Sequence, residues 1–238
     1  MILAILQARM SSSRLPGKVL KALAGAPMIL RQIERVRRAR RIDALLVATS
    51  GEASDDPLAK ALEGAGIAVF RGPLDDVLAR FALALDAHPA DHVVRLTGDC
   101  PLADPQVIDA TIALHLESGA DYTQNRLREK GYPKGLDVEV VTASALRQVA
   151  AEATAPEARE HVTWDLWNHL QRWRIARLEP PAEEGDVRWT VDRPDDYEFV
   201  AAVYADLYPA NPAFTSDDVR AWVRAHPAWA NWGGDRRV

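Results

Sequence analysis

The stretch ILAILQARMSSSRLPGK, residues 2–18, decides how the fold is interpreted. Residues 2–6 form a continuous apolar run, which is typical of a strand buried on both faces of a parallel sheet. Three cations, Arg9, Arg14 and Lys18, follow among three serines and a Pro-Gly pair. Such cations and small donors can bind phosphate oxygens. Beyond the end of a strand they predict a site for a small anion, with a solvated surface loop as the alternative.

The composition narrows the classes of ligand and partner. The chain has 238 residues and a formal net charge of −5, so the basic stretch stands against an acidic background. This balance argues against nucleic acid and against an anionic membrane surface as partners. No apolar run approaches the ~20 residues of a membrane-spanning helix. The single cysteine, Cys100, leaves no disulfide within one chain and favours a reducing compartment, so we expect a cytoplasmic protein.

Strand patterns and helix patterns alternate through the first half of the chain. Apolar runs predict strands at residues 2–6, 45–49, 68–70 and 92–96, and helical periodicity predicts helices at 27–39, 57–62, 75–87 and 105–118. Asp104 and Pro105 supply the N-cap and the first turn of the last of these helices. Repeated strand–helix–strand units predict an α/β fold with a mainly parallel sheet and helices on both faces.

The alternation changes after about residue 120. Strands are expected at 121–125 and 136–141 around the loop REKGYPKG, residues 128–135, and then at 174–178 and 188–191. Helices are expected at 156–170, at 195–207 and from a capping box at Thr215 to about residue 225. The last six residues, GGDRRV, are expected to be frayed.

Two aspartates follow predicted strands in positions that suit metal ligands. Asp99 comes shortly after the fourth predicted strand, and Asp192 comes directly after the last one. A carboxylate at the end of a strand can hold Mg²⁺ against a phosphate, and the alternative for Asp99 is that it caps a turn. Asp195 and Asp196 are explained by the positive end of the helix that follows. Together with the basic stretch, the two acids favour nucleotidyl transfer, in which cations neutralise the phosphates.

Seven motifs in fixed order carry a resemblance to a known family. They are QARMSSSRLPGKVL (7–20), VATS (47–50), FRGPLDDVLAR (70–80), VRLTGDCPLADP (94–105), GLDVEV (135–140), REHVT (159–163) and RWTVDRPDDYEFV (188–200). The ordered set resembles the cytidylyltransferase family that includes the spore-coat polysaccharide biosynthesis enzymes. That group is similar to the CMP-sialic acid and CMP-3-deoxy-manno-octulosonate synthetases. The resemblance covers about residues 1–208.

The resemblance implies a fold and a domain organisation. The implied fold is the three-layer, Rossmann-like nucleotide-diphospho-sugar transferase fold with a mixed, mostly parallel central sheet. Residues 1–208 would form the nucleotidyltransferase domain, with an excursion at 120–185 for the sugar side and for a homodimer contact. Residues 209–238 would form a helical appendage.

The resemblance also implies roles by position. Arg14, Lys18 and Asp99 are implied to be catalytic, and Asp99 and Asp192 to bind Mg²⁺. The residues implied to bind the nucleotide are Leu6, Gln7, Ala8, Arg9, Ser13, Arg14, Lys18, Ala48, Thr49, Ser50 and Arg71. The residues implied to bind the acceptor are Tyr132, Lys134, Asp137, Glu139, Arg159, Glu160 and His161. For His161 a packing role beside two tryptophans is the alternative. Many members of the family have glycine in place of Ser11, and a positive φ there would strain the serine.

The implied reaction transfers CMP from CTP to a small sugar or sugar-acid acceptor and releases pyrophosphate, in surface polysaccharide biosynthesis. One alternative is a metal-dependent glycosyltransferase that uses a nucleotide-sugar donor. Its D-x-D acids would be represented only by Asp75 and Asp76, which resemble a helix start. The other alternative is a non-catalytic nucleotide-binding protein. The presence of both acids and all three cations argues against it, and the sequence does not specify the acceptor.

Overall fold

The computed structural model describes residues 1–127 and 130–238. The first two residues of the loop REKGYPKG, Arg128 and Glu129, lie outside the described residues. No helix in the described ranges is long and apolar enough to cross a membrane.

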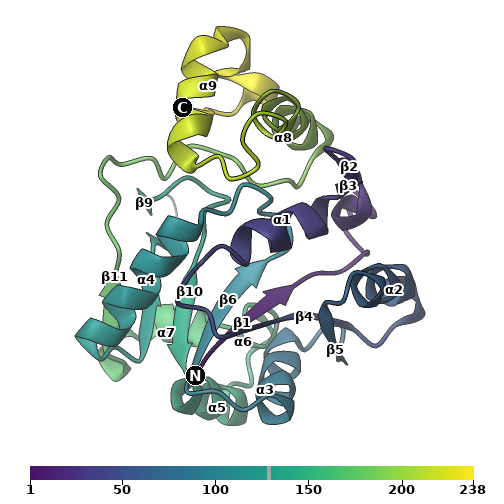
Figure 1. Ribbon diagram of the computed structural model, residues 1–238. Helices are drawn as coiled ribbons and strands as arrows, with labels where there is room; N and C mark the ends of the chain where they lie inside the picture. Colours follow the sequence, from purple (N-terminus) through teal and green to yellow (C-terminus); the bar gives the residue numbers. More distant parts are fainter. Residues whose placement is uncertain (128–129) are drawn as a thin grey trace.

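A central sheet of seven strands organises the chain, in the order β11-β7-β10-β6-β1-β4-β5 (Figure 1). All neighbouring strands in it are parallel except that β10 runs antiparallel to β6 and β7. The mixed, mostly parallel sheet expected from the sequence is therefore confirmed. Its strands are β1 (Ile2–Gln7), β4 (Ala44–Ser50), β5 (Ala68–Gly72), β6 (His92–Thr97), β7 (Tyr122–Gln124), β10 (Glu139–Thr142) and β11 (Ile175–Arg177); β2 (Ala22–Leu23) pairs with β3 (Ala26–Pro27), and β8 (Arg126–Leu127) with β9 (Lys130–Gly131).

Strand β1 is an interior strand of the sheet, between β6 and β4. Its side chains alternate between two cores, as the pleat of a strand requires. Ala4 and Leu6 pack on one face, and Leu3 and Ile5 pack on the other. Because all four are essentially without exposed surface, the apolar run at residues 2–6 marks a strand buried on both faces. The basic stretch therefore begins at the carboxyl end of an interior strand.

Helices cover both faces of the sheet (Figure 1). One core holds side chains of α1 (Met28–Val36), α2 (Asp56–Gly64) and α4 (Pro105–Ser118), and the opposite core holds those of α3 (Val77–Ala87), α5 (Ala143–Glu152) and α7 (Trp164–Asn168). The remaining helices are α6 (Pro156–Glu160), α8 (Pro194–Leu207) and α9 (Ser216–Ala225). Short 3-10 helices occur at Lys18–Leu20, Ala53–Asp55, Leu170–Arg172, Pro227–Trp229 and Trp232–Gly234.

A third core joins α8, α9 and the end of the chain, at the top of Figure 1. The capping box of α9 is present, since Thr215 accepts from Asp218 N and Asp218 accepts from Thr215 N. The last residues are not frayed, which corrects the expectation from their polar composition. Arg237 is fully buried, and its carbonyl accepts a 2.8 Å hydrogen bond from Trp189 Nε1. The boundary expected at residue 208 stays a prediction.

Two expected elements differ from the structure, and one helix was not expected. The expected strand at 188–191 is a single bridge between Arg188 and Lys134, because this segment hydrogen-bonds to several loops in turn instead of to one strand. The expected helix at 156–170 is split into α6 and α7. Thr163, at the break, donates to the buried Glu139 at 2.6 Å, and this tertiary contact prevails over helical periodicity. Helix α5, capped by Thr142, was not predicted from the sequence.

Candidate active site

The basic stretch folds into a compact loop beyond β1. Gly17 adopts φ +68°, a conformation that glycine enters without strain, and its N–H donates to Met10 O at 3.0 Å. The turn directs Lys18 inward, so that this lysine is only 9% exposed. Among the described residues other than glycine, positive φ occurs at Ala24 alone, so Ser11 carries no such strain.

Lys18 joins the two predicted metal ligands. Its Nζ lies 2.9 Å from Asp192 Oδ1 and 3.4 Å from Asp99 Oδ2, and it donates to Val191 O at 2.7 Å. Asp99 follows β6 and Asp192 precedes α8, so segments that are distant in sequence meet at one ammonium group. Arg14, on the exposed side of the loop, lies 3.2 Å from Asp192 Oδ2. The structure thus brings all four residues to one edge of the sheet.

Asp192 is held ionised by the cations around it. Arg188 donates to its Oδ2 at 3.0 Å, and Lys134 Nζ lies 3.9 Å from the same oxygen. Burial alone would raise the pKa of Asp192, but the hydrogen bonds and charges of Lys18, Arg188 and Arg14 lower it to about 2. A carboxylate with so low a pKa stays charged and available to a cation at neutral pH.

Asp196 fixes the backbone of Asp192 by hydrogen bonds. Its carboxylate accepts from the backbone N–H of Asp192 at 3.0 Å and of Arg193 at 2.9 Å. It also accepts from Arg188 at 2.7 Å and from Arg237 at 3.1 Å. The side chain of Asp196 is fully buried, and these partners hold its pKa well below the usual value despite the burial. The positive end of α8, to which the sequence analysis attributes Asp196, is therefore only one reason for an acid at this position.

Two cavities open at this edge of the sheet. The loop cavity, of about 450 Å³, is lined by the basic stretch together with Leu74, Val77 and Arg80. The inner cavity, of about 290 Å³, lies over the strands β6, β7 and β10. Both cavities are lined by Thr97 and Asp99, so Asp99 stands where they meet. Thr97 Oγ1 donates to Asp99 Oδ1 at 2.6 Å and orients this carboxylate.

The loop cavity collects most of the residues expected to bind a nucleotide. Its wall includes Gln7, Ala8, Arg9, Ser13, Arg14 and Lys18. It also includes Glu160 and His161, which the sequence placed on the acceptor side. Glu160 is the last residue of α6 and His161 is its C-cap, so both lie where the expected helix is interrupted.

Five of the residues expected at the nucleotide support the wall instead of lining it. Leu6 and Ala48 lie within the apolar cores. Thr49 and Ser50 are buried and donate to Asp55, whose carboxylate also accepts from Met10 N at 2.7 Å. Arg71 is turned to the surface: it donates to Ser50 O at 2.9 Å and forms an ion pair with Asp56.

The inner cavity receives Lys134, Asp137 and Glu139 from the expected acceptor residues. Tyr132 packs between two cores instead. Arg159 forms a 2.5 Å ion pair with Asp76, which leaves it outside both cavities. Burial raises the pKa of Asp137, partly offset by the charge of Arg126 and by the N–H of Gly135.

Glu139 anchors a buried network that the sequence did not reveal. It is paired with Arg95 and accepts from Tyr122 and Thr163. Burial would raise the pKa of Glu139, but these partners lower it. Arg95 also donates to Gln7 Oε1 at 3.0 Å and so ties the inner cavity to the loop cavity. Residue types alone do not identify such a network, because Arg95 occupies an ordinary polar position in the sequence pattern of β6.

Cys100 is a packed side chain. The thiol is buried, and burial together with the neighbouring Asp99 raises its pKa well above the usual value. A thiolate nucleophile is therefore not formed at neutral pH.

The donor set suits a divalent cation shared with phosphate. No group of three or more His, Cys, Asp or Glu side chains within residues 1–127 and 130–238 could hold a metal ion by itself. Asp99 and Asp192 supply two carboxylates, and Mg²⁺ usually takes one or two carboxylates and completes its shell with phosphate oxygens and water. The residues present therefore fit Mg²⁺ bound together with a nucleotide.

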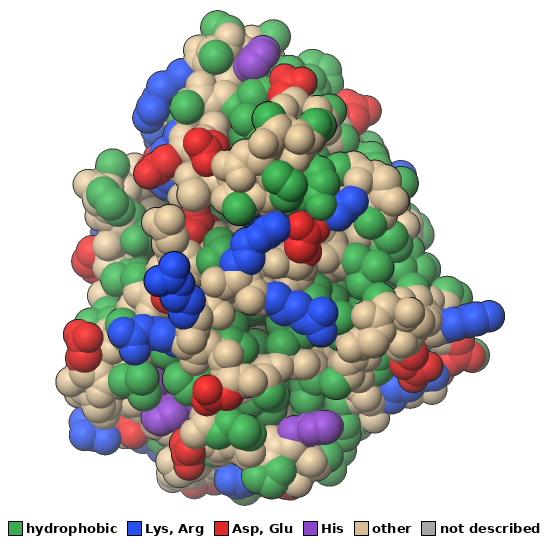
Figure 2. Space-filling view, in the orientation of Figure 1, with side chains coloured by type: hydrophobic (Ala, Val, Ile, Leu, Met, Phe, Trp, Pro, Cys, Tyr) green, Lys and Arg blue, Asp and Glu red, His purple; other side chains and the backbone are tan. Residues whose placement is uncertain are grey.

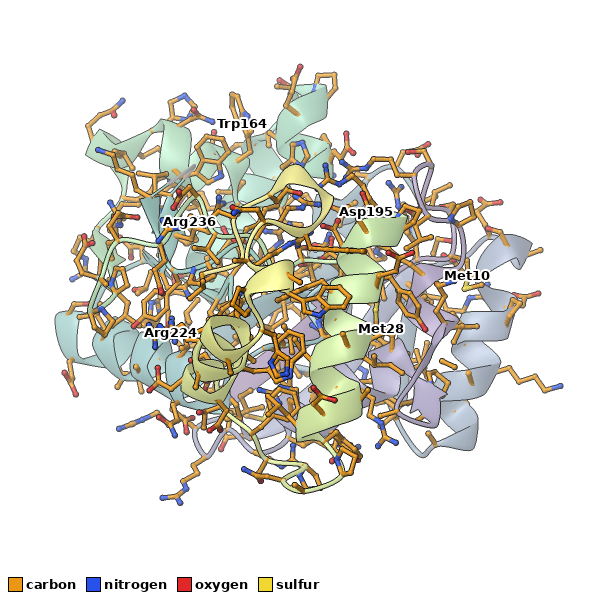
Figure 3. All side chains as sticks on the ribbon, turned by 90° about the horizontal axis from the view of Figure 1, so that it is seen from above. Met10, Met28, Trp164, Asp195, Arg224 and Arg236 are labelled. Atoms are coloured by element: carbon orange, nitrogen blue, oxygen red, sulfur yellow. The ribbon has the colours of Figure 1, made fainter. Side chains whose placement is uncertain are left out.

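The face of the molecule on which α1 lies carries a further group of cations. In Figure 2, Lys and Arg side chains gather across the middle of the visible face, below the α8–α9 end of the molecule. Figure 3, seen from above, labels Asp195 at the start of α8 between Met10 of the basic loop and Trp164 of α7. The basic loop, Val77 at the start of α3 and Asp192 before α8 line one cavity at this edge of the sheet.

The chain is similar over most of its length to known proteins. Residues 3–203 match the cytidylyltransferase family. The spore coat polysaccharide biosynthesis protein SpsF of Bacillus subtilis is 37% identical over 210 residues, which cover 85% of this chain and 86% of SpsF. The 3-deoxy-manno-octulosonate cytidylyltransferase 2 of Hydrogenovibrio crunogenus is 34% identical over 178 residues, which cover 68% of this chain and 69% of that protein.

The fold agrees with these similarities. The structure of a cytidylyltransferase from Leptospira borgpetersenii superposes with a TM-score of 0.90 at 25% identity, covering 96% of this chain and 95% of that one. The sheet and its helices have the nucleotide-diphospho-sugar transferase fold, as the resemblance implied. Because the match spans residues 3–203 and the fold agrees over nearly the whole chain, the protein belongs to the cytidylyltransferase family.

Proposed function

We propose that the protein transfers CMP from CTP to a small sugar or sugar-acid acceptor and releases pyrophosphate, for surface polysaccharide biosynthesis. The observation that carries this proposal is the junction of two cavities at Asp99. One cavity is lined by the cations of the basic stretch and the other by mixed acids, amides and cations. A transferase needs two adjoining sites, because the nucleotide and the acceptor must react in line at one phosphorus.

In this mechanism the chain positions charge and forms no covalent intermediate. The acceptor oxygen attacks the α-phosphorus, and pyrophosphate leaves on the opposite side. Arg14 and Lys18 stabilise the charge that builds on the β- and γ-phosphates. Asp99 and Asp192 would hold Mg²⁺, which neutralises phosphate charge when bound. Lys18 bridges these acids by itself, so in the complex its ammonium is shared between them and the phosphates.

The nucleoside is proposed to lie along Gln7 and Ala8, with Arg9 and Ser13 near the phosphates. Lys134, Asp137 and Glu139 are proposed to form the acceptor site in the inner cavity. A polyhydroxylated acceptor suits this wall, since it offers both hydrogen-bond donors and acceptors. Glu160 and His161 are proposed to face the nucleotide, because they line the loop cavity.

A pyrophosphate-release screen tests the proposal. The purified protein is offered each of the four nucleoside triphosphates with Mg²⁺ and a panel of keto-sugar acids, polyol phosphates and sugar phosphates. Release that requires CTP and one acceptor class is the expected result. Binding of CTP without release across the panel would favour a nucleotide-binding protein, and release of a nucleoside diphosphate from a nucleotide-sugar would favour a glycosyltransferase.

A homodimer and a cytoplasmic location stay predictions from the sequence, as does the absence of nucleic-acid and membrane partners. Sedimentation of the full chain at two concentrations would check the first of these.

A further inference from the structure

Asp55 is a buried carboxylate that holds the basic loop from outside it. The residue has no exposed surface and directly precedes α2, but its side chain forms no capping hydrogen bond to that helix. Its Oδ1 accepts instead from the backbone N–H of Met10 at 2.7 Å. An aspartate at the start of a helix usually caps that helix, so Asp55 gives up this stabilisation in order to bind the loop.

The second oxygen of Asp55 fixes the carboxylate to the sheet. Oδ2 accepts from Thr49 Oγ1 at 3.0 Å, from the Ser50 N–H at 3.1 Å and from the Ser50 hydroxyl. Burial would raise the pKa of Asp55, but the N–H of Met10 and the donors of Thr49 and Ser50 lower it. Because Thr49 and Ser50 end β4, the ionised Asp55 links the carboxyl end of β4 to the loop beyond β1, 45 residues away in sequence.

Met10 is the residue at which the basic loop closes. Its carbonyl accepts from the N–H of Ser12 at 2.9 Å and from the N–H of Gly17 at 3.0 Å. The loop that these bonds close carries Ser12, Ser13 and Arg14, all of which line the loop cavity. Figure 3 labels Met10 beside the ribbon of α2, which Asp55 precedes. The position of the Met10 peptide therefore decides where these side chains stand.

The loop needs such a support before any ligand is bound. Arg9, Ser13 and Arg14 are exposed, and the two arginines carry like charges that repel each other in the absence of an anion. A loop with few buried contacts opens easily, and a ligand that must order it loses affinity. A buried carboxylate that holds the loop in its binding conformation lowers this cost.

We propose that Asp55 is a positioning residue, which preorganises the basic loop for phosphate by fixing the Met10 N–H. This inference rests on the proposed binding of a nucleoside triphosphate. A residue that only supports the fold would change stability, whereas a positioning residue also changes the affinity for the phosphate chain.

Calorimetry on the full chain with two probes tests the inference. CTP and inorganic tripolyphosphate, each with Mg²⁺, are titrated into the wild type, Asp55→Ala and Asp55→Asn. We expect Asp55→Ala to lose about 10-fold in affinity for both probes, since both present a phosphate chain to the loop. Asp55→Asn keeps one oxygen for the Met10 N–H, because the hydroxyls of Thr49 and Ser50 can turn to accept from its amide group. It should bind both probes within about 3-fold of the wild type.

Asp104→Ala is the matched control. Asp104 is also buried, at 3% exposure, and its carboxylate also accepts from two backbone N–H groups, those of Gln106 at 2.8 Å and Ser216 at 2.7 Å. It lines neither cavity. Its variant should lower the urea midpoint as Asp55→Ala does and bind both probes as the wild type does.

Hydrogen exchange of the wild type needs no variant and therefore keeps the test open if Asp55→Ala does not fold. The N–H groups of Ser11 and Ser13 have no backbone acceptor within the residues that the structure describes. In the protein without ligand, NMR should show the Met10 amide exchanging at least about 10-fold more slowly than these two.

Four results would overturn the inference alone, in a wild type that binds both probes. Wild-type affinity in Asp55→Ala would make Asp55 purely structural, and so would an equal loss of affinity in Asp104→Ala. Equal losses in Asp55→Ala and Asp55→Asn would assign the effect to the charge of Asp55 instead of its bond to Met10. A Met10 amide that exchanges as fast as that of Ser11 would show that the loop is not held. A wild type that binds neither CTP nor tripolyphosphate would overturn the proposed function and the inference together.

Discussion

Arg237, the residue before the last, donates from Nη2 to Oδ1 of Asp196 at 3.1 Å, and both side chains are fully buried. The last residues are thereby held beside the segment that carries Asp192, because Asp196 also accepts from the backbone N–H of Asp192. Arg237 further donates to the carbonyls of Arg188 and Trp232 at 2.7 and 3.0 Å. A tail that the sequence predicts to be frayed thus supports Asp192, the proposed metal ligand.

Arg237→Met should destabilise the protein strongly. The substitution removes one of the two close cations of buried Asp196, which keeps Arg188, and it takes the donor away from the carbonyls of Arg188 and Trp232. Loss of these charge-assisted and buried hydrogen bonds costs about 2 kcal/mol or more of unfolding free energy. We expect a clear drop in the urea midpoint and weaker CTP binding, since Asp196 would be held by fewer partners.

The neighbouring arginine provides the control. Arg236 forms an exposed 2.7 Å ion pair with Asp186, so Arg236→Met should cost no more than about 1 kcal/mol. Equal effects of the two substitutions on the urea midpoint would show that burial of the tail contributes nothing.

The sequence predicted the features that local patterns encode. Apolar runs located β1 and its neighbours, and polar residues at helix starts located Asp104 and Thr215 as caps. The position of the basic stretch beside Asp99 was predictable as well, since β1 and β6 are parallel neighbours whose ends meet at one edge. Asp192 reaches the same edge for another reason, because the segment before it is no strand of the sheet but forms a single bridge to Lys134.

The rest depends on contacts between distant segments. Arg80 belongs to an ordinary helical pattern, and nothing in that pattern indicates that its guanidinium is buried in a cavity wall. The tail carries glycine and charge, a composition typical of frayed ends, yet Asp196 inside α8 gives Arg237 a buried partner. Thr163 ends a helical pattern because Glu139 lies within reach of its hydroxyl. Periodicity does not report such pairings.

Gly135→Ala should destabilise the packing of the loop at Gly135 against the backbone of Trp189 and Thr190. Gly135 has φ +114°, and a Cβ there would lie 2.6 Å from Thr190 N and 2.7 Å from the carbonyl carbon of Trp189. Both the conformation and the backbone contact oppose a side chain, so we expect a loss of about 2 kcal/mol or more in the free energy of unfolding.

Gly64→Ala is the control for this substitution. Gly64 ends α2, and a Cβ there would meet nothing within 4 Å. The variant should be neutral or more stable by up to about 1 kcal/mol, because alanine favours a helix. A Gly135→Ala protein as stable as Gly64→Ala in urea would contradict the close approach of these segments.

The pair His92 and His115 should make stability depend on pH. His115 is buried, its Nε2 lies 3.0 Å from His92 Nδ1 and its Nδ1 lies 2.9 Å from Thr123 Oγ1. Burial, and then the charge of His92, lowers the pKa of His115 to about 4. Since the unfolded chain binds the proton near pH 6.5, stability is complete above that pH and is lost as the pH falls toward 4.

His115→Gln removes this titration and can keep a hydrogen bond to Thr123. The wild type should lose about 2 kcal/mol more than the variant between pH 7 and pH 5, measured by urea unfolding at both values. Parallel losses in the two proteins would show that His115 is protonated in the folded state as readily as in the unfolded one.

Lys18→Ala should remove most of the turnover. The ammonium joins Asp99 to Asp192 and is proposed to meet the leaving phosphates, so its loss should slow pyrophosphate release by about 10²-fold or more. Without Lys18 the two carboxylates repel each other, and a higher Mg²⁺ concentration should restore part of the rate, since a divalent cation can neutralise both. Lys60→Ala, an exposed lysine on α2, should leave the rate unchanged. Equal rates of pyrophosphate release in Lys18→Ala and Lys60→Ala at every Mg²⁺ concentration would show that Lys18 takes no part in the reaction.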